Sequence, residues 1–461
     1  MIDKEEIKRK ALEFDIHHAN VERDYVFGWL LKSIFENDYL RQALVFKGGN
    51  CLRKAFYPDT RFSADLDFSA PSAIDLQRMT DQINAACREA GRACGVEFLV
   101  ERNTFEPGPV IDRQRQSYKG RVYFTDFFGK QDDLTISVKV DVTAYDRLYL
   151  APVTRGLIHP YSDTAACRAE LRCMALEEIV ANKLKCLIQR RHSHDLFDLV
   201  YATFINRSIE LDRSLVLRTF LNKTIFSASP GAAKEILLGL SLTFFGGVWE
   251  RFIHCPKPTR FGFDKAVIGF KDAIEALFEG VQTRTWGEQA FFPSEHRNLI
   301  MEAGAERKLL RLTYDGVERL VEPYSLAYKR PSTGAPREYF YAYDRTGGRT
   351  SGPGVKSFVH TGINRMELTA EGFEPRYDIE LAKAGEDARK GYFGQVFSAG
   401  SRRGQLRPPK ARAFKGFQQS YKVQCPYCQK QFTRTTASLA LNPHKAPNGY
   451  ACGARQGYRA Y

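Results

Sequence analysis

The chain has 461 residues, of which 43% are hydrophobic, and it carries a formal net charge of +14. A chain of this length can bury the cores of about three domains, and its hydrophobic content is ordinary for a globular protein. So large an excess of positive charge favours a polyanionic partner, and nucleic acid is the first expectation.

The N-terminus, MIDKEEIKRK, is charged and lacks the apolar run of a signal peptide. The longest apolar stretch, Ile236 to Trp249, is interrupted by glycines and is shorter than the ~20 residues that a membrane span needs. Ten cysteines without a secretory signal indicate reduced thiols, some of which could bind metal. We therefore expect a cytoplasmic protein with no membrane partner.

A glycine pair followed by two aspartates, in FKGGNCLRKAFYPDTRFSADLDF (residues 46–68), is the most informative motif. Gly48 and Gly49 allow close approach to a ligand, and the residues after them are expected to begin a helix whose free N–H groups suit phosphate. Asp65 and Asp67 are expected on one face of a strand, because side chains alternate along a strand. Two such carboxylates can hold Mg²⁺, which binds the phosphates of a nucleoside triphosphate. The glycine pair alone would indicate a loop, and the two aspartates alone would indicate a solvated strand. Their order and spacing together indicate nucleotidyl transfer.

Residues 176–202 are expected to be helical, because apolar residues recur there at spacings of three and four. Lys183 borders the apolar stripe, where it either points towards phosphates or simply extends over the edge of the core. Asp195 lies after a His-Ser-His turn, where a helix N-cap is the structural alternative to a functional role. His192 and His194 are expected to be turn residues and not metal ligands.

Several of these stretches together resemble the AbiEii/MenT-type nucleotidyltransferases, the toxin halves of toxin–antitoxin and phage-defence (abortive infection) pairs. The similar segments are ERDYVFGWLLKSIF (residues 22–35), VFKGGNCLRK, RFSADLDF, and LEEIVANKLKCLIQRRHSHDLFDLVYA (residues 176–202). Two residues depart from the family pattern. Asn50 stands where the family usually has a small residue, and His194 stands where it usually has an arginine, directly before Asp195. The second departure leaves Arg190, Arg191 or His194 to supply positive charge.

The resemblance implies an α+β fold with a polymerase-β-like catalytic core over residues 1–205 and a helical part over 206–295. It implies that Asp65 and Asp67 bind two Mg²⁺ ions and that Lys183 and Asp195 are catalytic or nucleotide-binding. The nucleotide-binding residues implied by the motif are Lys47, Gly48, Gly49, Asn50, Arg61 and Ser63.

A third carboxylate is expected from a later strand of such a fold, and Asp141 is the candidate. The segment LTISVKVDV (residues 134–142) alternates Ile136, Val138 and Val140 with polar residues, so it is expected to be a strand with one buried side. Asp141 lies on the polar face. The alternative is an exposed aspartate at the end of a strand.

The segment 300–385 changes to strand-like patterns separated by turns at Asp315-Gly316, residues 332–334 and Gly347-Gly348. The order of its strands resembles a WYL domain, a small β-barrel that often binds ligands related to nucleic acid and regulates an attached module. A plain β-barrel spacer is the alternative.

Residues 386–422 are expected to form a basic arm that binds phosphates. Seven cations and no acid occur between 401 and 422, and aromatic residues are interleaved with them. The residues predicted to bind nucleic acid are Arg402, Arg403, Arg407, Lys410, Arg412 and Lys415. A solvated linker is the alternative.

The last segment, residues 423–461, is expected to be a zinc ribbon. Cys425 and Cys428 form a C-x2-C knuckle, and His444 and Cys452 follow it as candidate third and fourth ligands of a structural Zn²⁺. The segment is too small to fold on apolar burial, so metal would supply its stability. Unrelated reduced cysteines are the alternative.

These features predict a Mg²⁺-dependent toxin that transfers a nucleotide from an NTP to RNA, such as the 3′ end of tRNA. A cognate antitoxin protein is a possible partner. Two other classes remain open: transfer to a hydroxyl of a small molecule or protein, and a nucleotide-sensing, DNA-binding regulator without turnover.

Overall fold

The structure is a computed structural model. It describes residues 2–110, 116–125, 127, 135–190, 192–282, 290–329, 337–377, 379, 381, 421–425, 430–434, 438–445, 451–452, 456 and 458–459.

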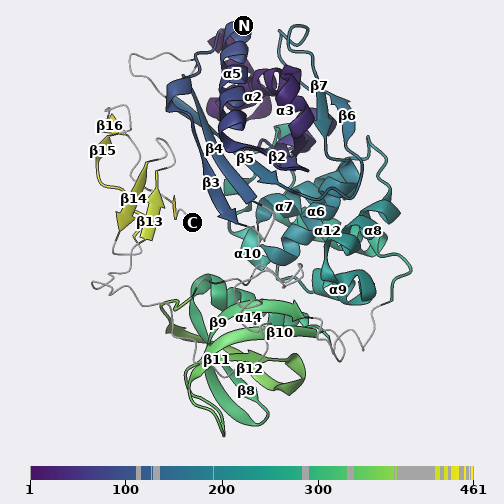
Figure 1. The fold of residues 1–461 in the computed structure, drawn as a ribbon, viewed down its shortest axis with the longest axis vertical. Coiled ribbons are helices and arrows are strands. Elements are labelled where there is room, and N and C mark those ends of the chain that lie inside the picture. The colour runs from purple at the N-terminus through teal and green to yellow at the C-terminus, as the bar shows by residue number, and fades with distance from the viewer. Residues whose placement is uncertain are drawn as a thin grey trace.

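The segment up to residue 205, called the N-terminal domain below, mixes helices and strands (Figure 1). Its helices are α1 (Lys4–Phe14), α2 (His18–Glu36), α3 (Asp38–Ala43), α4 (Gly48–Cys51), η1 (Leu52–Phe56), α5 (Leu76–Cys94), η2 (Val100–Arg102), α6 (Leu176–Gln189), α7 (Ser193–Val200) and η3 (Tyr201–Ile205). Its strands are β1 (Val45–Lys47), β2 (Asp65–Ala70), β3 (Thr104–Val110), β4 (Gln116–Thr125), β5 (Thr135–Ala144), β6 (Val153–Gly156) and β7 (Glu170–Cys173).

The seven strands form one mixed sheet in the order β3-β4-β5-β2-β1-β7-β6. The central strand β2 pairs antiparallel with β1 and parallel with β5. Leu66 and Phe68 of β2 are fully buried, whereas Asp65 and Asp67, which alternate with them, are half-buried. The predicted alternation on this strand, and the predicted strand that contains Asp141, are both confirmed.

Local sequence signals fix the ends of helix α5, which packs against α2. The carboxylate of Asp75 caps its N-terminus by accepting a hydrogen bond from the backbone N–H of Arg78 at 2.7 Å. Gly95 ends the helix with φ of 71°, a left-handed conformation that glycine adopts without strain. The face between these ends buries Met79, Ile83 and Cys87.

The segment after residue 205 is helical, as the sequence predicts. Its elements are α8 (Arg213–Lys223), η4 (Ile225–Ala228), α9 (Pro230–Leu238), α10 (Thr243–Gly246), α11 (Trp249–Phe252), η5 (Lys257–Thr259), α12 (Phe263–Leu277) and α14 (Ser294–Glu306). Helices α8 and α12 pack on α6 and α7, so this part supports the helix pair that carries Lys183 and Asp195. Among the described residues, no helix combines the length and the apolar character needed to cross a membrane.

A second, five-stranded antiparallel sheet follows in the order β11-β10-β9-β8-β12. Its strands are β8 (Lys308–Tyr314), β9 (Val317–Lys329), β10 (Arg337–Asp344), β11 (Gly354–Phe358) and β12 (Ile363–Gly372), with the short helix η6 (His360–Gly362) before β12. The predicted turn between β8 and β9 is confirmed. Asp315 and Gly316 have φ of 48° and 74°, the pair of positive values that a type I′ hairpin turn requires.

Helix α14 packs on this sheet, and a buried ion pair ties the two together. Arg297 of α14 donates to both carboxylate oxygens of Glu338 on β10, at 2.6 and 2.7 Å. The second of those oxygens also accepts from the backbone N–H of Phe292 at 3.0 Å. The sheet is therefore joined to the end of the helical part by charged contacts out of reach of water.

The C-terminal segment contributes two small sheets, drawn in yellow in Figure 1. One has the order β14-β13-β17, and the other pairs β15 with β16. The strands are β13 (Tyr421–Gln424), β14 (Gln431–Arg434), β15 (His444–Lys445), β16 (Ala451–Cys452) and β17 (Tyr458–Arg459). The predicted basic arm, with Arg402, Arg403, Arg407, Lys410, Arg412 and Lys415, lies outside the described residues, and so does Cys428.

Candidate functional site

Three aspartates from two neighbouring strands form the centre of the candidate site. Asp65 and Asp67 share one face of β2, and the parallel register pairs Asp67 with Asp141 of β5. On the other side of β2, the register pairs Asp67 with Lys47 of β1. The fold thus places Asp141 beside the D-x-D strand, where the third carboxylate was predicted.

The glycine pair lies directly against these side chains. Gly48 has φ of 81°, and a Cβ built on it would come within 2.2 Å of the Oδ2 atom of Asp67. A Cβ on Gly49 would come within 2.6 Å of Nη2 of Arg61. The sequence predicts that these glycines make room for a ligand. In the structure they also make room for the side chains of the site, so any larger residue would displace Asp67 or Arg61.

Two hydrogen bonds fix the start of β2. Ser63 donates from Oγ to Oδ1 of Asp65 at 2.7 Å. Asn50, which is buried, donates from Nδ2 to the backbone oxygen of Asp65 at 2.5 Å. Asn50 therefore holds the strand that carries both aspartates, and Ser63 orients the first of them. Their predicted contacts with nucleotide stay predictions.

The acidic cluster carries negative charge that the protein only partly neutralises. Burial, reinforced by repulsion from Asp65 and Asp141, raises the pKa of Asp67 to about 7, against the opposing effect of Lys47 and Lys183. Burial and the charge of Asp65 also raise the pKa of Asp141. Lys47 donates from Nζ to Oδ2 of Asp146 at 2.7 Å.

An ion-pair network beside the cluster connects the loop before β2 to helices α6 and α7. Arg61 donates two hydrogen bonds to the carboxylate of Asp198, at 2.7 and 2.8 Å. Lys183 lies 2.7 Å from Oδ2 of Asp198 and 3.1 Å from Oδ1 of Asp195. Burial alone would lower the pKa of Lys183, but the carboxylates of Asp198 and Asp195 raise it above its usual value. Lys183 is therefore a charged residue held at the site and not a side chain extended into solvent.

Asp195 is not a helix N-cap. Helix α7 begins after His192, which makes no capping hydrogen bond with its side chain, and Asp195 is the third residue of the helix, in its first turn. Its carboxylate accepts from Arg190 at 2.9 and 3.2 Å. Burial would raise the pKa of Asp195, but Lys183 and Arg190 lower it well below its usual range. Of the three predicted sources of positive charge near Asp195, Arg190 is the one the structure places there.

His194 has a different role. Its Nε2 lies 2.9 Å from the backbone oxygen of Phe252, and burial together with Arg61 lowers its pKa to about 3. It is therefore a neutral residue that joins α7 to the last residue of α11. Arg191, the remaining candidate, lies outside the described residues.

Charged residues that the sequence did not single out as site residues also belong to the site. Asp198 lies three residues after Asp195, and that helical spacing was the available signal. Asp146 follows β5 and pairs with Lys47. Arg23 of α2 interacts electrostatically with Asp65, and its Nε is buried without a hydrogen-bond partner among the described residues.

The oxygen donors at the site suit Mg²⁺. The carboxylates of Asp65, Asp67 and Asp141 are more widely spaced than the ligands of a closed metal cage. Their oxygens do not all come within 4.8 Å of one another. Mg²⁺ usually takes one or two protein carboxylates and completes its shell with water and substrate phosphates. The open arrangement, in which burial and the neighbouring carboxylates raise the pKa of Asp67 and a cation would relieve their repulsion, fits that use.

Comparison with known proteins identifies the domain that contains this site. Residues 29–238 match the family model described as nucleotidyl transferase AbiEii toxin, type IV toxin–antitoxin system. The match supports an AbiEii-type nucleotidyltransferase domain in this part of the chain. The predicted resemblance is confirmed over these residues, which include all the side chains of the site described above except that of Arg23.

A solved structure, MenT4, a nucleotidyltransferase toxin from Mycobacterium tuberculosis H37Rv, is also similar to the chain. The TM-score is 0.40 and the identity is 19%, over 60% of this chain and 90% of that one. The search of curated proteins finds no significant match.

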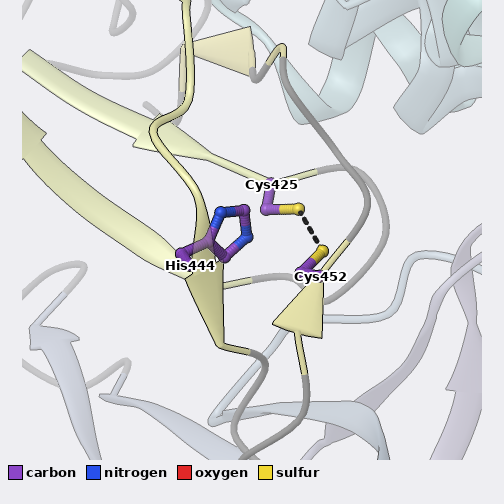
Figure 2. A group of neighbouring side chains, drawn as sticks. All are labelled: Cys425, His444 and Cys452. Carbon is purple, nitrogen blue, oxygen red and sulfur yellow. Dashed lines mark hydrogen bonds between the residues drawn. The ribbon is translucent and has the colours of Figure 1, made fainter.

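A second cluster lies outside the AbiEii-type domain, in the C-terminal segment. Cys425, His444 and Cys452 converge there, and their ligand atoms lie within 4.8 Å of one another (Figure 2). These are three of the four predicted zinc ligands; Cys428, the fourth, is outside the described residues.

Proposed function

We propose that this chain is a Mg²⁺-dependent nucleotidyltransferase toxin that transfers a nucleoside monophosphate from an NTP to RNA, with the 3′ end of tRNA as the leading acceptor. The observation that carries the proposal is the register that places Asp67 beside Asp141, with Gly48 against Asp67, inside the AbiEii-type match. The family description also supports a cognate antitoxin as partner. A cytoplasmic location fits this role.

In the proposed reaction, an acceptor hydroxyl oxygen attacks the α-phosphorus, and the bond from that phosphorus to the bridging oxygen breaks to release pyrophosphate. Mg²⁺ bound by Asp65 and Asp67 would activate the hydroxyl and stabilise the leaving group. Asp141 would complete the acidic cluster. Zn²⁺ bound by the C-terminal cysteines would be structural and would take no part in the transfer.

The remaining residues position substrate and neutralise charge. Lys47, next to Asp67 in the sheet, supplies positive charge near the phosphates. Lys183 is held by two carboxylates at the edge of the site, and Arg61 and Asn50 keep the loop before β2 in place. These contacts are made between groups of the protein itself, which lowers the cost of organising the site during the reaction.

Incubation with each labelled NTP and total RNA tests the proposal. We expect label from one preferred NTP to enter an RNA band, to require Mg²⁺ and to be absent from the Asp67→Asn variant. Label in protein or in a small molecule would assign a different acceptor. Binding of NTP without any transfer would favour the regulator without turnover.

The basic arm is proposed to supply much of the affinity for RNA. Replacing its six predicted phosphate-binding residues by glutamine should weaken RNA binding and flatten the plot of log affinity against log salt concentration, by about 0.7 for each phosphate that the arm no longer neutralises. Those residues are Arg402, Arg403, Arg407, Lys410, Arg412 and Lys415. The measurement is a salt titration of RNA affinity.

A matched variant removes exposed arginines from the AbiEii-type domain, at positions 41, 88 and 92. It should change the slope less than the arm variant does for each charge removed. A larger change in this control than in the arm variant would assign the nucleic-acid surface to the catalytic half.

We also propose that residues 300–385 form the predicted WYL-like domain, with residues 386–422 as the arm and 423–461 as a zinc ribbon. The order of strands β8 to β12 supports the first assignment. Phe340 and Tyr341 of β10 are buried, so these rings pack the core and do not offer a stacking surface.

A further inference from the structure

We propose that Cys425, His444 and Cys452 bind one Zn²⁺ ion that holds the C-terminal segment together. This site is separate from the nucleotidyltransferase reaction and stands whether or not that proposal is correct. It rests on how three short strands bring the three side chains to one point.

The backbone brings the ligands together from three places in the sequence. Cys425 follows β13, and its N–H donates to the backbone oxygen of Lys430, the residue before β14, at 2.9 Å. His444 and Cys452 are directly paired across β15 and β16. Figure 2 shows the imidazole and the two thiols pointing towards one another.

The separation of the two sulfurs fits shared ligation. Sγ of Cys425 and Sγ of Cys452 lie 3.6 Å apart. Two thiolates on one tetrahedral Zn²⁺, each with a Zn–S bond of about 2.3 Å, are about 3.8 Å apart. A disulfide would require about 2.05 Å. The sulfurs are therefore at the separation of two ligands and not of a covalent pair.

The histidine is oriented as metal ligands usually are. Its Nδ1 lies 3.0 Å from the backbone oxygen of Asn442, so a proton on Nδ1 donates there and leaves the lone pair of Nε2 for the metal. The ring also contacts Phe432 edge to face, with centroids 4.8 Å apart. Both contacts limit rotation of the imidazole.

The described residues of the segment form a very small apolar core. Its buried members are Val423, Cys425, Leu441 and Cys452, so two of these four are the ligands themselves. So small an apolar core cannot offset the entropy lost on folding, whereas a structural Zn²⁺ in a small domain supplies folding free energy directly. A ligand set of two cysteines and a histidine favours Zn²⁺ over the hard cations Mg²⁺ and Ca²⁺. The sequence predicts Cys428, outside the described residues, for the fourth position.

The test is elemental analysis of the full-length chain, purified without added metal or chelator. We expect about one equivalent of zinc per chain, and a loss of most of it in Cys425→Ser, Cys452→Ser and His444→Ala. After replacement of the ion by Co²⁺, the parent chain should show the visible absorption of a tetrahedral cobalt–thiolate site, and the three variants should not.

Cys255→Ser is the matched control, because Cys255 is also buried and its thiol contacts Thr259 at 3.3 Å, a contact that a serine hydroxyl can replace. It should retain both the zinc and the cobalt spectrum. A parent chain without zinc that also fails to take up Co²⁺ would overturn the proposal. Zinc retained in all three ligand variants would overturn it too. Because metal content and spectrum are read without any NTP, neither outcome depends on the transfer reaction.

Discussion

Asp65→Asn and Asp67→Asn are each expected to lower the rate of nucleotide transfer by about 10³-fold or more, equivalent to about 4 kcal/mol of transition-state stabilisation. The amide keeps the size of the side chain and removes the charge that a divalent cation needs. Asp67 also lies between Lys47 and Asp141 in the sheet, so a change there alters the electrostatics of the whole cluster. The measurement is single-turnover transfer of label from NTP to acceptor at saturating Mg²⁺.

Asp81→Asn provides the comparison, because Asp81 is exposed on α5 and accepts a hydrogen bond from Gln77 of the same helix. It should transfer nucleotide at the parent rate. Circular dichroism should show that all three variants keep the parent fold. Near-parent rates in both Asp65→Asn and Asp67→Asn would mean that the chemistry occurs elsewhere in the chain.

The parts of the site that are local in sequence could be predicted from the sequence. The alternation of Asp65, Leu66, Asp67 and Phe68 determines which side chains share a face, and the structure confirms it. The hairpin turn at Asp315-Gly316 could also be predicted from the sequence. A two-residue turn of this type requires positive φ at both positions, and Asp-Gly is one of the few pairs that adopt it.

The parts that depend on contacts between distant segments could not be predicted in the same way. That Asp141 lies beside Asp67 follows from the pairing of β2 with β5, and periodicity alone does not say which strands are neighbours. The hydrogen bonds between Arg61 and Asp198 join residues 137 apart in the chain, and neither residue has a local pattern that reveals its partner. The sequence predicts Arg61 as a nucleotide contact, whereas the structure commits its guanidinium to this carboxylate.

Asp24→Ala is expected to lower the free energy of unfolding of the N-terminal domain by about 3–5 kcal/mol. Asp24 of α2 lies 2.8 Å from Nε of Arg53 and 2.9 Å from Nζ of Lys54, and none of the three side chains is more than 2% exposed. Removing the carboxylate leaves two buried cations without their counter-charge. Arg53 and Lys54 both belong to η1, which follows the glycine pair closely in the chain, so their displacement should also disturb the candidate site. The measurement is chemical denaturation followed by circular dichroism.

Glu36→Ala tests whether this cost comes from burial. Glu36 lies on the same helix and pairs with Lys32, but its side chain is 55% exposed. Exposed pairs contribute at most about 1 kcal/mol, so this variant should unfold close to the parent. A loss in Asp24→Ala no larger than that of Glu36→Ala would show that the buried group does not stabilise the domain.

The dependence on pH gives a second readout for the same carboxylate. Burial would raise the pKa of Asp24, but Arg53 and Lys54 lower it well below its usual range. A carboxylate with a lowered pKa in the folded state stabilises the protein above its unfolded pKa of about 3.9, and this stabilisation is lost as the pH falls below that value. The difference in stability between the parent and Asp24→Ala should therefore be constant above about pH 5 and shrink at lower pH. A difference that stayed constant down to about pH 3 would mean that the charge of Asp24 is not what stabilises the fold, because the packing around the carboxylate does not depend on its protonation.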